Sequence, residues 1–478
     1  MKSPVRVRFA PSPTGFMHLG SVRVAFLNYL FARKHQGTFV LRIEDTDASR
    51  NLDEARTKIV EDLAWLGLPY QEGPVVGGKC GPYLQSERND IYQEQLQVLI
   101  ENCKVYRCFC SAEELEAKRQ KQMAMGKPPR YDRTCLQLSD DKIKAKIAAD
   151  LPFIWRFKLN YDQLLEIKDL ARGTISFEMK HFSDFALTRP DGTCTFMFAN
   201  FVDDWLMNIT HVIRGEDHLS NTALQAALFD AFALPLPTYW HLQIICNKEG
   251  EKLSKRDFGF SLEDLKQAGY LPVAILNYIG TAGVSFAEEV QSLEELAKNY
   301  PFESLHHTGN IRYDVDKLTW FNHKWLNRLD AHALLAWVKP ILHAALPAST
   351  TCSDDELVRL IAAVKSDLQV LPDIVNALRF VFNPPAITPQ QFVETMGEQV
   401  ASAMQAIIAG RLDASTPQAL LDGVKADATA RGLKVKEAFS SLRFVLTGAT
   451  QGVGMQELMT ILPAEEIKRR FMSILPVN

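Results

Sequence analysis

Long apolar runs and a strong charge of one sign are both missing from this sequence. No apolar stretch approaches the roughly eighteen residues that a membrane-spanning helix needs, so we expect no membrane association. Residues 1–6 carry charges with no apolar run behind them, so we also expect no signal peptide. The net charge of −4 does not indicate whether the protein binds nucleic acid, because local basic patches bind the phosphates. These absences predict a cytoplasmic protein.

A disulfide framework is also absent. The eight cysteines are scattered, with four at Cys103, Cys108, Cys110 and Cys135. In a chain without an export signal, such cysteines are expected to be reduced thiols or metal ligands. What is present is an ordinary globular composition, 47% hydrophobic and 23% charged. The 478 residues exceed what one hydrophobic core usually serves, so we predict two to four domains.

The first fifty residues have the pattern of an α/β unit. Residues 5–10 alternate in period two, as a strand does. The Pro/Gly cluster at 11–15 predicts a turn. Residues 18–34 repeat apolar side chains at helical spacing, and residues 38–43 predict a second strand. This order predicts a parallel strand pair with a right-handed crossover.

Changes of pattern indicate where the further domains begin and end. We predict a parallel-sheet α/β domain over residues 1–88 and 194–245, interrupted by an α+β insertion over 89–193 with a charged helix at 111–122. A helical connector follows over 246–330 and includes a helix at 272–279. Residues 331–478 predict an all-helical half, in which Pro384-Pro385 separates two blocks.

The turn after the first strand is the first candidate for chemistry. Residues 8–15 (RFAPSPTG) lead into His18-Leu19-Gly20-Ser21 at the start of the predicted helix. The free N–H groups of a helix N-terminus suit an anionic phosphate, and Gly20 lets a nucleotide approach the backbone. His18 can donate a hydrogen bond to a phosphate oxygen. The alternative is a proline-rich turn with a surface histidine.

A cation-rich loop is the second candidate. Lys252-Leu253-Ser254-Lys255-Arg256 holds three cations in five residues. Lysines on a mobile loop can stabilise the charge that develops on phosphates in a transition state and then withdraw. An isolated basic segment of this kind is otherwise a solvated loop.

Together the two motifs resemble the HIGH-type turn and the KMSKS-type loop of class I aminoacyl-tRNA synthetases. Longer strings narrow the resemblance to bacterial-type glutamyl-tRNA synthetases, and it is specific through residue 330. These strings are RFAPSPTG at 8–15, LRIEDTD at 41–47, GPYLQSER at 81–88, Asp203-Asp204, HVIRGEDH at 211–218 and KLSKR at 252–256. Beyond residue 330 the resemblance is looser, although SLRFVLTG at 441–448 is similar to that family's C-terminal domain.

The resemblance implies a glutamate–tRNA ligase that acts in two steps. Glutamate would attack the α-phosphorus of ATP, bound with magnesium, and the 2′-hydroxyl of the terminal tRNA adenosine would then accept the glutamyl group. The expected tRNA is tRNA-Glu, with tRNA-Gln left open as a second substrate. The resemblance also implies a monomer in which activation waits for tRNA. The α/β domain would be a Rossmann-like catalytic domain, the insertion would bind the acceptor stem and the helical half the anticodon.

Substrate charge indicates what the glutamate pocket needs. Two carboxylates and one ammonium require a guanidinium and an acidic partner, and arginine binds carboxylates bidentately. By the resemblance, Arg8 and Arg214 hold the carboxylates and Glu44 meets the ammonium, although a structural salt bridge is the alternative for each pair. The other implied positions are Ala10, Ser12, Phe196 and Asn200 for glutamate, His18, Gly20, Asp217, His218 and Lys255 for ATP, and His18, Lys252 and Lys255 for catalysis.

Two positions depart from the family pattern. Ser21 stands where the second histidine of the HIGH-type turn would be. We therefore expect the helix N-terminus and the lysines to make the catalytic contribution of that histidine. Phe196 replaces a tyrosine that contacts the amino acid. If that hydroxyl made an ordinary hydrogen bond, its absence weakens glutamate binding by about 1–1.5 kcal/mol, unless Asn200 or a water makes the hydrogen bond instead.

A third constellation has the composition of a metal site. Cys108-Phe109-Cys110, expected on a hairpin, is followed by Tyr131 and Cys135. Three thiolates can hold a structural zinc if a fourth ligand completes the tetrahedron. Some relatives supply a histidine where this chain has Gln137, so Tyr131 or a water would serve instead. Three reduced cysteines without metal are the alternative.

Basic residues gather in the predicted insertion. They are a candidate phosphate footprint for tRNA, or a solvated helix paired with Glu113, Glu114 and Glu116. The eight are Lys104, Arg107, Lys118, Arg119, Lys121, Lys127, Arg130 and Arg133. Lys468-Arg469-Arg470 is interpreted instead as the cationic end of a helix.

Three other functions are alternatives at this point. They are a nucleotidyltransferase of the same superfamily, an enzyme that modifies a tRNA base with glutamate, and a catalytically impaired tRNA-binding paralogue. The helical half argues against the first two. The intact His18, Lys255, Arg214 and Glu44 argue against the third, whereas Phe196 counts weakly for it.

Overall fold

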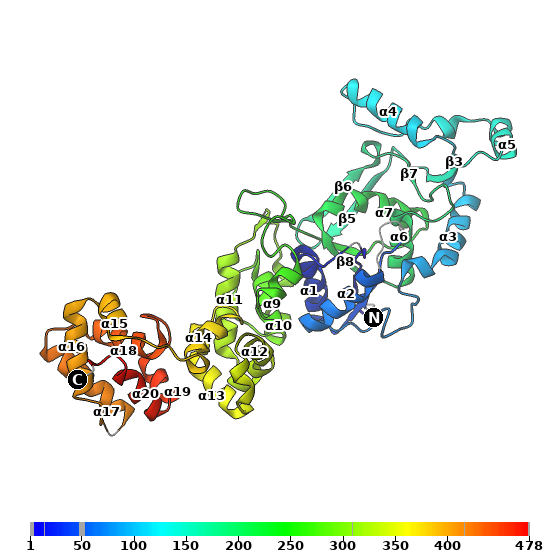
Figure 1. Ribbon diagram of the computed structural model, residues 1–478. Coiled ribbons are helices and arrows are strands. Elements are labelled where there is room, and N and C mark those ends of the chain that lie inside the picture. The colour runs from blue at the N-terminus through cyan, green and yellow to red at the C-terminus, as the bar shows by residue number, and fades with distance from the viewer. Residues whose placement is uncertain (1–3, 14, 47–52, 308, 415, 477–478) are drawn as a thin grey trace. The chain divides into compact units, whose positions relative to one another are not determined.

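The computed structural model describes residues 4–13, 15–46, 53–307, 309–414 and 416–476 (Figure 1). Thr14 and Asp47 of the motifs above, like Met1 to Ser3, lie outside the described residues. The chain forms two compact units, one of Met1–Asp264 with Leu276–Asp314 and the other of Leu265–Ile275 with Val315–Asn478. The predicted connector, 246–330, is therefore divided between the two units.

The predicted strand, helix and strand at the N-terminus are confirmed. Strand β1 (Arg6–Phe9) pairs in parallel with β2 (Thr38–Leu41), and α1 (Leu19–Lys34) joins them. Most side chains of α1 are buried, as expected for a crossover helix covered on several sides. Helix α2 (Asp53–Leu66) follows.

A second sheet has the strand order β6-β5-β9-β8. Strands β8 (His211–Gly215) and β9 (Thr238–Leu242) are parallel, β5 (Leu164–Asp169) runs parallel to β9, and β6 (Gly173–Glu178) is antiparallel to β5. Helices α6 (Phe196–Leu206) and α7 (Leu219–Ala231) lie beside it, and their aromatic side chains Phe201 and Phe229 make an edge-to-face contact.

The β5–β6 hairpin lies inside the segment predicted as the insertion, yet it extends the sheet of β8 and β9. The boundary at 193 rested on a change of composition, and composition does not identify a strand's partner. Which strands pair is decided by side chains far apart in the chain.

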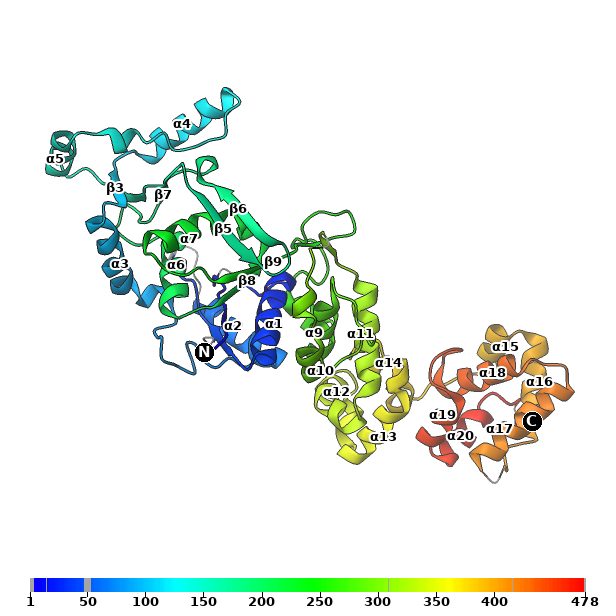
Figure 2. The same ribbon diagram turned by 180° about the vertical axis from the view of Figure 1, so that it is seen from behind.

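The rest of the predicted insertion forms a smaller antiparallel sheet, β3-β4-β7, made of β3 (Val105–Cys108), β4 (Ile154–Phe157) and β7 (Phe185–Ala186). Helix α3 (Asn89–Glu101) precedes it. Helices α4 (Ala112–Ala124) and α5 (Asp140–Ala148) have no buried side chain and lie on the side of this sheet away from α6 and α7 (Figures 1 and 2). Ser111 and Glu114 form a capping box at the start of α4.

The segment after β9 supports the cation-rich loop. Strand β10 (Ile245–Cys246) pairs in parallel with β11 (Ile311–Arg312), and Cys246 also bridges to Lys252 at the start of the loop. Helices α8 (Leu262–Gln267), α9 (Pro272–Thr281) and α10 (Leu293–Asn299) follow. Helix α9 begins at Pro272, a residue suited to the first helical turn.

The second unit is helical, as predicted, and no strand occurs in its described part. Its first block holds α11 (Val315–Arg328), α12 (Ala331–Ala345), α13 (Asp354–Val364) and α14 (Asp373–Phe382). No helix covers Pro384-Pro385, the predicted break. The second block holds α15 (Pro389–Met396), α16 (Glu398–Ala409), α17 (Pro417–Ala430), α18 (Val435–Thr447), α19 (Met455–Ile461) and α20 (Ala464–Met472). Among the described helices, none is both long and apolar enough to cross a membrane.

Candidate active site

A cavity of about 550 Å³ lies in the first unit, where β1, β2, β8 and β9 end. In parallel sheets, ligands bind at the carboxyl ends of the strands. The predicted residues that line this cavity are Arg8, Ala10, Ser12, His18, Gly20, Glu44, Phe196, Asn200, Arg214, Asp217, His218 and Lys252. Residues from position 8 to position 252 therefore meet in one site.

Lys255 is the exception among the predicted cleft residues. Its side chain is exposed and does not line the cavity. The backbone N–H and hydroxyl of Ser254 both donate to Asp257, which closes a turn around Lys255. Lys252, in contrast, lies at the cavity wall with its Nζ 3.1 Å from Oδ2 of Asp217. The two lysines of the loop are not in equivalent positions.

His18 forms the N-cap of α1. Its Nδ1 accepts from the backbone N–H of Ser21 at 3.2 Å, and its Nε2 lies 3.0 Å from the Ser21 hydroxyl. The residue that departs from the family pattern therefore holds the histidine ring. A Cβ on Gly20 would come within 3.0 Å of that ring, so glycine leaves the space that His18 occupies.

The His18 ring also stacks on the ring of Phe260, just beyond the cation-rich loop, with the ring centres 5.4 Å apart. Burial and the nearby charge of Lys252 lower the pKa of His18. The ring is therefore neutral near pH 7 and retains one N–H to donate. This is the protonation state that a phosphate-binding donor needs to act without adding charge.

Arg214, at the end of β8, is a buried cation whose hydrogen-bond partners among the described residues are neutral groups. Its Nη2 donates to the hydroxyl of Thr222 at 2.6 Å and to Oε1 of Gln225 at 2.7 Å, both neutral acceptors. Within the described part of the chain no carboxylate forms an ion pair with it, and its buried Nε has no hydrogen-bond partner. Burial lowers its pKa to about 10. A buried, uncompensated guanidinium in a cavity is a site for an anion.

Arg8 is held differently. Its Nε and Nη2 donate to the two carboxylate oxygens of Asp204 at 3.1 and 3.3 Å. The guanidinium of Arg8, which we expected to bind a substrate carboxylate, is therefore already bound to Asp204. Arg8 still lines the cavity, so it contributes positive potential and a fixed wall.

Glu44 belongs to the same group of buried charged side chains as Arg8, Arg42 and Asp204. It accepts from Nη2 of Arg42 at 2.9 Å and from the Asn200 amide at 2.5 Å. Burial raises the pKa of its carboxyl against the opposing charges of Arg42 and Arg8. An additional cation beside Glu44 would favour its ionised form.

Some residues of the cluster were quoted in a motif without being given a role. Asp204 joins Arg8 to Arg42, and Asp203 joins Arg42 to Arg88. Both aspartates are buried in α6, whose sequence is otherwise almost wholly apolar. That pattern was a usable signal, because acids on a buried helix face need cationic partners.

Asp217 and His218 form the far wall of the cavity, between β8 and α7. Burial and the charge of Arg214 lower the pKa of His218 to about 4, so this ring is neutral near pH 7. Its ring centre lies 6.0 Å from that of Phe196. The two rings give this wall flat apolar surfaces, as a purine base requires.

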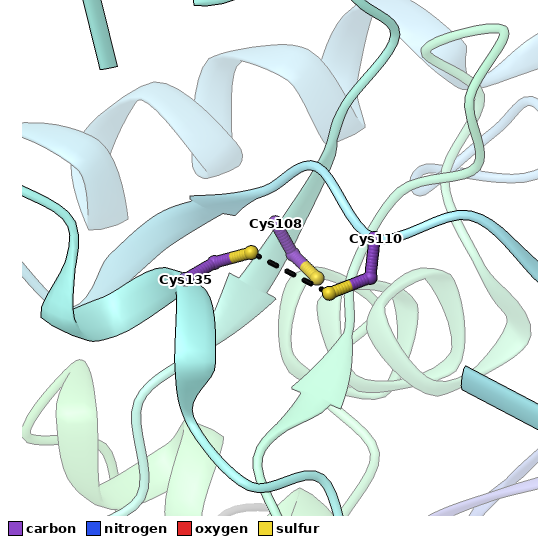
Figure 3. A group of neighbouring side chains, drawn as sticks. All are labelled: Cys108, Cys110 and Cys135. Atoms are coloured by element: carbon purple, nitrogen blue, oxygen red, sulfur yellow. Dashed lines mark hydrogen bonds between the residues drawn. The ribbon is translucent and has the colours of Figure 1, made fainter. Parts of the chain in front are cut away.

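The three predicted metal-ligand cysteines converge in the insertion (Figure 3). The sulfur atoms of Cys108, Cys110 and Cys135 all lie within 4.8 Å of one another. The hydroxyl of Tyr131 is 3.3 Å from the Cys108 sulfur and 3.7 Å from the Cys110 sulfur. Three sulfurs and one oxygen therefore lie close together.

The expectation that Cys108 and Cys110 lie on a hairpin is wrong. Cys108 ends β3, whose antiparallel partner at Ile154 belongs to β4, and α4 and α5 intervene in the chain. The pairing depends on apolar contacts such as Phe109 with Phe153, which local sequence does not reveal.

Several basic residues of the insertion have internal partners. Arg133 makes a two-pronged ion pair with Asp184, Lys118 pairs with Asp132, and Arg107 stacks on Trp155. In the second unit, Arg470 is buried and donates to the carbonyl groups of Leu446 and Phe380. This agrees with a structural role for the cations at 468–470.

Two family models match the chain. One, described as the catalytic domain of class I tRNA synthetases (E and Q), matches residues 4–320. The other, described as an anticodon binding domain, matches residues 321–475.

Relatives match over the full length. The chain is 37% identical to a glutamate–tRNA ligase of Halalkalibacterium halodurans, with 99% of this chain and 100% of the relative covered. It is 34% identical to a glutamate–tRNA ligase of Bacillus subtilis at the same coverage. Among solved structures, a glutamate tRNA ligase from Elizabethkingia meningosepticum in complex with its amino acid is 32% identical, with a TM-score of 0.87 over 99% of both chains.

Proposed function

This chain belongs to the class I tRNA synthetases for glutamate and glutamine and is a glutamate–tRNA ligase, and we propose how its cavity performs that reaction. The α-carboxylate of L-glutamate attacks the α-phosphorus of ATP, so that glutamyl-adenylate forms and pyrophosphate leaves. The ribose hydroxyl of the terminal tRNA adenosine then attacks the acyl carbon and AMP leaves. Catalysis is by positioning and charge stabilisation, without a protein nucleophile.

Arg214 reads the side-chain carboxylate of glutamate. The observation that carries this assignment is its burial at the cavity wall without a carboxylate partner in the described residues. A carboxylate placed there gains a charge-assisted hydrogen bond. The neutral amide of glutamine gains less and would leave the cation uncompensated. The charge of Arg214 therefore discriminates glutamate from glutamine.

The rest of the amino acid is held by the cluster beside Arg214. Glu44 receives the ammonium group, with the Asn200 amide fixing its carboxylate. Arg8, clamped by Asp204, supplies positive potential for the α-carboxylate rather than a free fork. Ala10, Ser12 and Phe196 complete the wall around the substrate.

ATP occupies the part of the cavity between α1 and the cation-rich loop. His18 and the backbone at Gly20 face the phosphates, and Asp217 and His218 flank the adenosine. ATP arrives as its magnesium complex, so that ion is part of the substrate. Lys252 stabilises the charge on the departing pyrophosphate, and Lys255 joins it when the loop moves inward.

The tRNA contacts are proposed at domain level. Residues 89–193 meet the acceptor stem and residues 331–478 meet the anticodon, which the match to an anticodon binding domain supports. We also propose a monomer acting in the cytoplasm, where tRNA is charged. Charging assays with purified tRNA-Glu and tRNA-Gln test whether the second tRNA is a substrate, and pyrophosphate exchange without tRNA tests whether activation waits for it.

The cysteine cluster fits a structural zinc ion. Cys108, Cys110 and Cys135 provide soft thiolate ligands from two segments of chain, and the Tyr131 hydroxyl lies beside them as a fourth donor. This donor set suits a closed tetrahedral site. Bound there, zinc would fix β3 against the segment around Cys135 and take no part in the chemistry.

The central assignment is tested with Arg214→Gln, which keeps a polar but shorter side chain and removes the charge. Aminoacylation of tRNA-Glu with glutamate should lose at least about a hundredfold in kcat/KM, because a charge-assisted interaction is lost in the transition state. Arg33→Gln, the same substitution at an exposed arginine of the first unit outside residues 89–193, is the matched control. Wild-type kcat/KM for glutamate in Arg214→Gln would disprove the assignment.

A further inference from the structure

A buried chain of polar groups lies behind Arg214. The Arg214 guanidinium donates to the Thr222 hydroxyl at 2.6 Å, and that hydroxyl lies 2.7 Å from Nε2 of His241. Nδ1 of His241 lies 2.8 Å from Oδ2 of Asp169. All four side chains are buried, and Asp169 and His241 are not in contact with the cavity.

The direction of each hydrogen bond in this chain can be assigned. The Asp169 carboxylate only accepts, so Nδ1 of His241 carries the proton, and the neutral ring then presents Nε2 as an acceptor. The Thr222 hydroxyl has one proton and two acceptors within reach, the carbonyl oxygen of His218 at 3.2 Å and Nε2 of His241 at 2.7 Å, and it donates to the nearer Nε2. Its oxygen accepts from Arg214. Burial lowers the pKa of His241 against the charge of Asp169, which agrees with the neutral ring. The donors therefore all point from the cation toward the carboxylate.

Asp169 is itself fixed by the sheet. Its Oδ1 accepts from the backbone N–H groups of Ala171 and Arg172, and its Oδ2 accepts from the backbone N–H of His241. Asp169 ends β5, where that strand pairs with β9. The anionic end of the chain is thus anchored on the hairpin whose place in the catalytic sheet was not expected.

On the basis of the proposed reading of glutamate by Arg214, we propose that Asp169, His241 and Thr222 are positioning residues that set the orientation of Arg214 for the substrate side-chain carboxylate. A direct Arg214–carboxylate pair would orient the guanidinium and neutralise it. Relayed through two neutral groups, the negative charge of Asp169 orients the guanidinium and leaves its charge for the substrate.

A second series of hydrogen bonds also starts at Nη2 of Arg214 and passes through neutral groups to a carboxylate. Nη2 of Arg214 donates to Gln225, the Gln225 amide donates to Asn200 at 2.6 Å, and Asn200 donates to Glu44. Both chains hold Nη2 and end on a buried carboxylate. Nη1 is left to meet a ligand, whereas Nε is buried and has no partner among the described groups.

The test compares substitutions that keep or remove the Thr222 hydroxyl. Thr222→Val removes it at nearly constant shape, and Thr222→Ser retains it. In tRNA aminoacylation by the full chain, Thr222→Val should raise KM for glutamate about tenfold, as expected when a cation loses a buried acceptor. KM for ATP and for tRNA should change less than about twofold, because Thr222 does not line the cavity and its contact beside the ATP site is only to the backbone carbonyl of His218, which valine leaves in place. Thr222→Ser should restore KM for glutamate to within about threefold of the wild type.

The matched control is Thr281→Val. Thr281 is also buried in the first unit, and its hydroxyl donates to the Tyr278 carbonyl away from the cavity. It should leave all three KM values unchanged. If Thr222→Val does not fold, His241→Gln, which keeps an acceptor for Thr222, is compared with His241→Leu, which does not, and only the leucine variant should raise KM for glutamate.

Equal KM values for glutamate in the hydroxyl-retaining and hydroxyl-lacking variants would overturn the proposal, as would a parallel rise in KM for ATP. The Arg214→Gln variant separates this failure from failure of the proposed function. If Arg214→Gln loses glutamate and Thr222→Val does not, Arg214 reads the substrate without the relay. If Arg214→Gln itself retains wild-type kinetics, both proposals fail.

Discussion

Asp204 holds Arg8 by two hydrogen bonds, at 3.1 and 3.3 Å, and holds Arg42 by a third at 2.8 Å. One carboxylate on α6 therefore compensates two guanidinium groups from β1 and the segment after β2. Burial would raise the pKa of Asp204, but the charges of Arg8 and Arg42 outweigh it and lower that pKa. Among the described residues, Arg8 has its ion pair with this carboxylate, whereas Arg42 is also paired with Glu44 and Asp203.

Asp204→Asn should therefore destabilise the first unit strongly. It leaves two buried guanidinium groups with less negative charge, a loss of about 3–5 kcal/mol by comparison with other buried pairs. The measurement is the urea unfolding transition followed by tryptophan fluorescence. Glu178→Gln, which removes an exposed partner of Lys180 in the same unit, should leave the transition unmoved. Equal stability of the two variants would show that Asp204 is not the central partner.

The two lysines of the cation-rich loop should have separable kinetic effects. Both side chains are exposed, but Lys252 lines the cavity and pairs with Asp217, whereas Lys255 does not line the cavity. Lys252→Ala should raise KM for ATP and lower kcat, because it acts on bound and reacting phosphates alike. Lys255→Ala should lower kcat by about tenfold or more with KM for ATP nearly unchanged, since it acts only after loop closure. Single-turnover adenylation with tRNA present, at varied ATP concentration, measures the rate and the ATP dependence for both variants. A larger increase of KM for ATP in Lys255→Ala than in Lys252→Ala would contradict this assignment.

Local patterns were sufficient to predict the elements around the site. The strand, turn and helix over residues 6–34 follow from period-two and helical spacing, and the HIGH-type turn placed His18 correctly at the helix N-terminus. These features depend on residues close in the sequence. The bond between Arg8 and Asp204 does not, because 196 residues separate them, and the sequence offered Asp203-Asp204 only as an unexplained string.

The residues behind Arg214 were missed for a different reason. Thr222 and Gln225 lie three residues apart in α7, so they share one face of a helix whose neighbours are apolar. Two polar residues on a buried face were a signal for an internal network. His241 and Asp169 carried no such signal, because their contact depends on the pairing of β5 with β9, and that pairing was not predicted.

Zinc content tests the cysteine cluster. Wild-type protein purified without chelator should contain about one zinc per chain, and Cys110→Ser should lose most of it, since a hydroxyl is a poor replacement for a thiolate ligand. Cys103→Ser removes an exposed cysteine outside the cluster and should retain the metal. Emission spectroscopy on both variants gives the stoichiometry. A metal-free wild type with normal stability would favour three reduced thiols instead.

The helical unit should lose stability in acid through Glu466. Hydrogen bonds from Arg469 and Arg470 lower the pKa of Glu466 to about 2 from the ordinary 4.5. Because the folded pKa is the lower one, this stabilisation is complete above about pH 4.5 and is lost as the pH falls toward 2. After allowance for solvent screening it is on the order of 2 kcal/mol.

Glu466→Gln should accordingly melt at a lower temperature than wild type at pH 7, and the two melting temperatures should converge only as the pH falls to about 2. Circular dichroism of the helices provides the melting temperatures. Glu465→Gln, on the exposed neighbour, should keep the wild-type pH dependence. A Glu466→Gln melting curve that parallels wild type at every pH would exclude this ion pair as the source.

Phe196→Tyr should improve the enzyme. Phe196 lies at the start of α6 and lines the same cavity as Asn200 and Arg214, and we expect a hydroxyl added to its ring to hydrogen-bond to glutamate bound there. A new hydrogen bond to the substrate is worth about 1–1.5 kcal/mol, or up to about tenfold in KM for glutamate. Phe198→Tyr is the matched control. That ring is fully buried away from the cavity, so its added hydroxyl should lower stability without lowering KM. Aminoacylation at varied glutamate concentration distinguishes the two, and an unchanged KM in Phe196→Tyr would mean that Asn200 already satisfies the group that the family's tyrosine would contact.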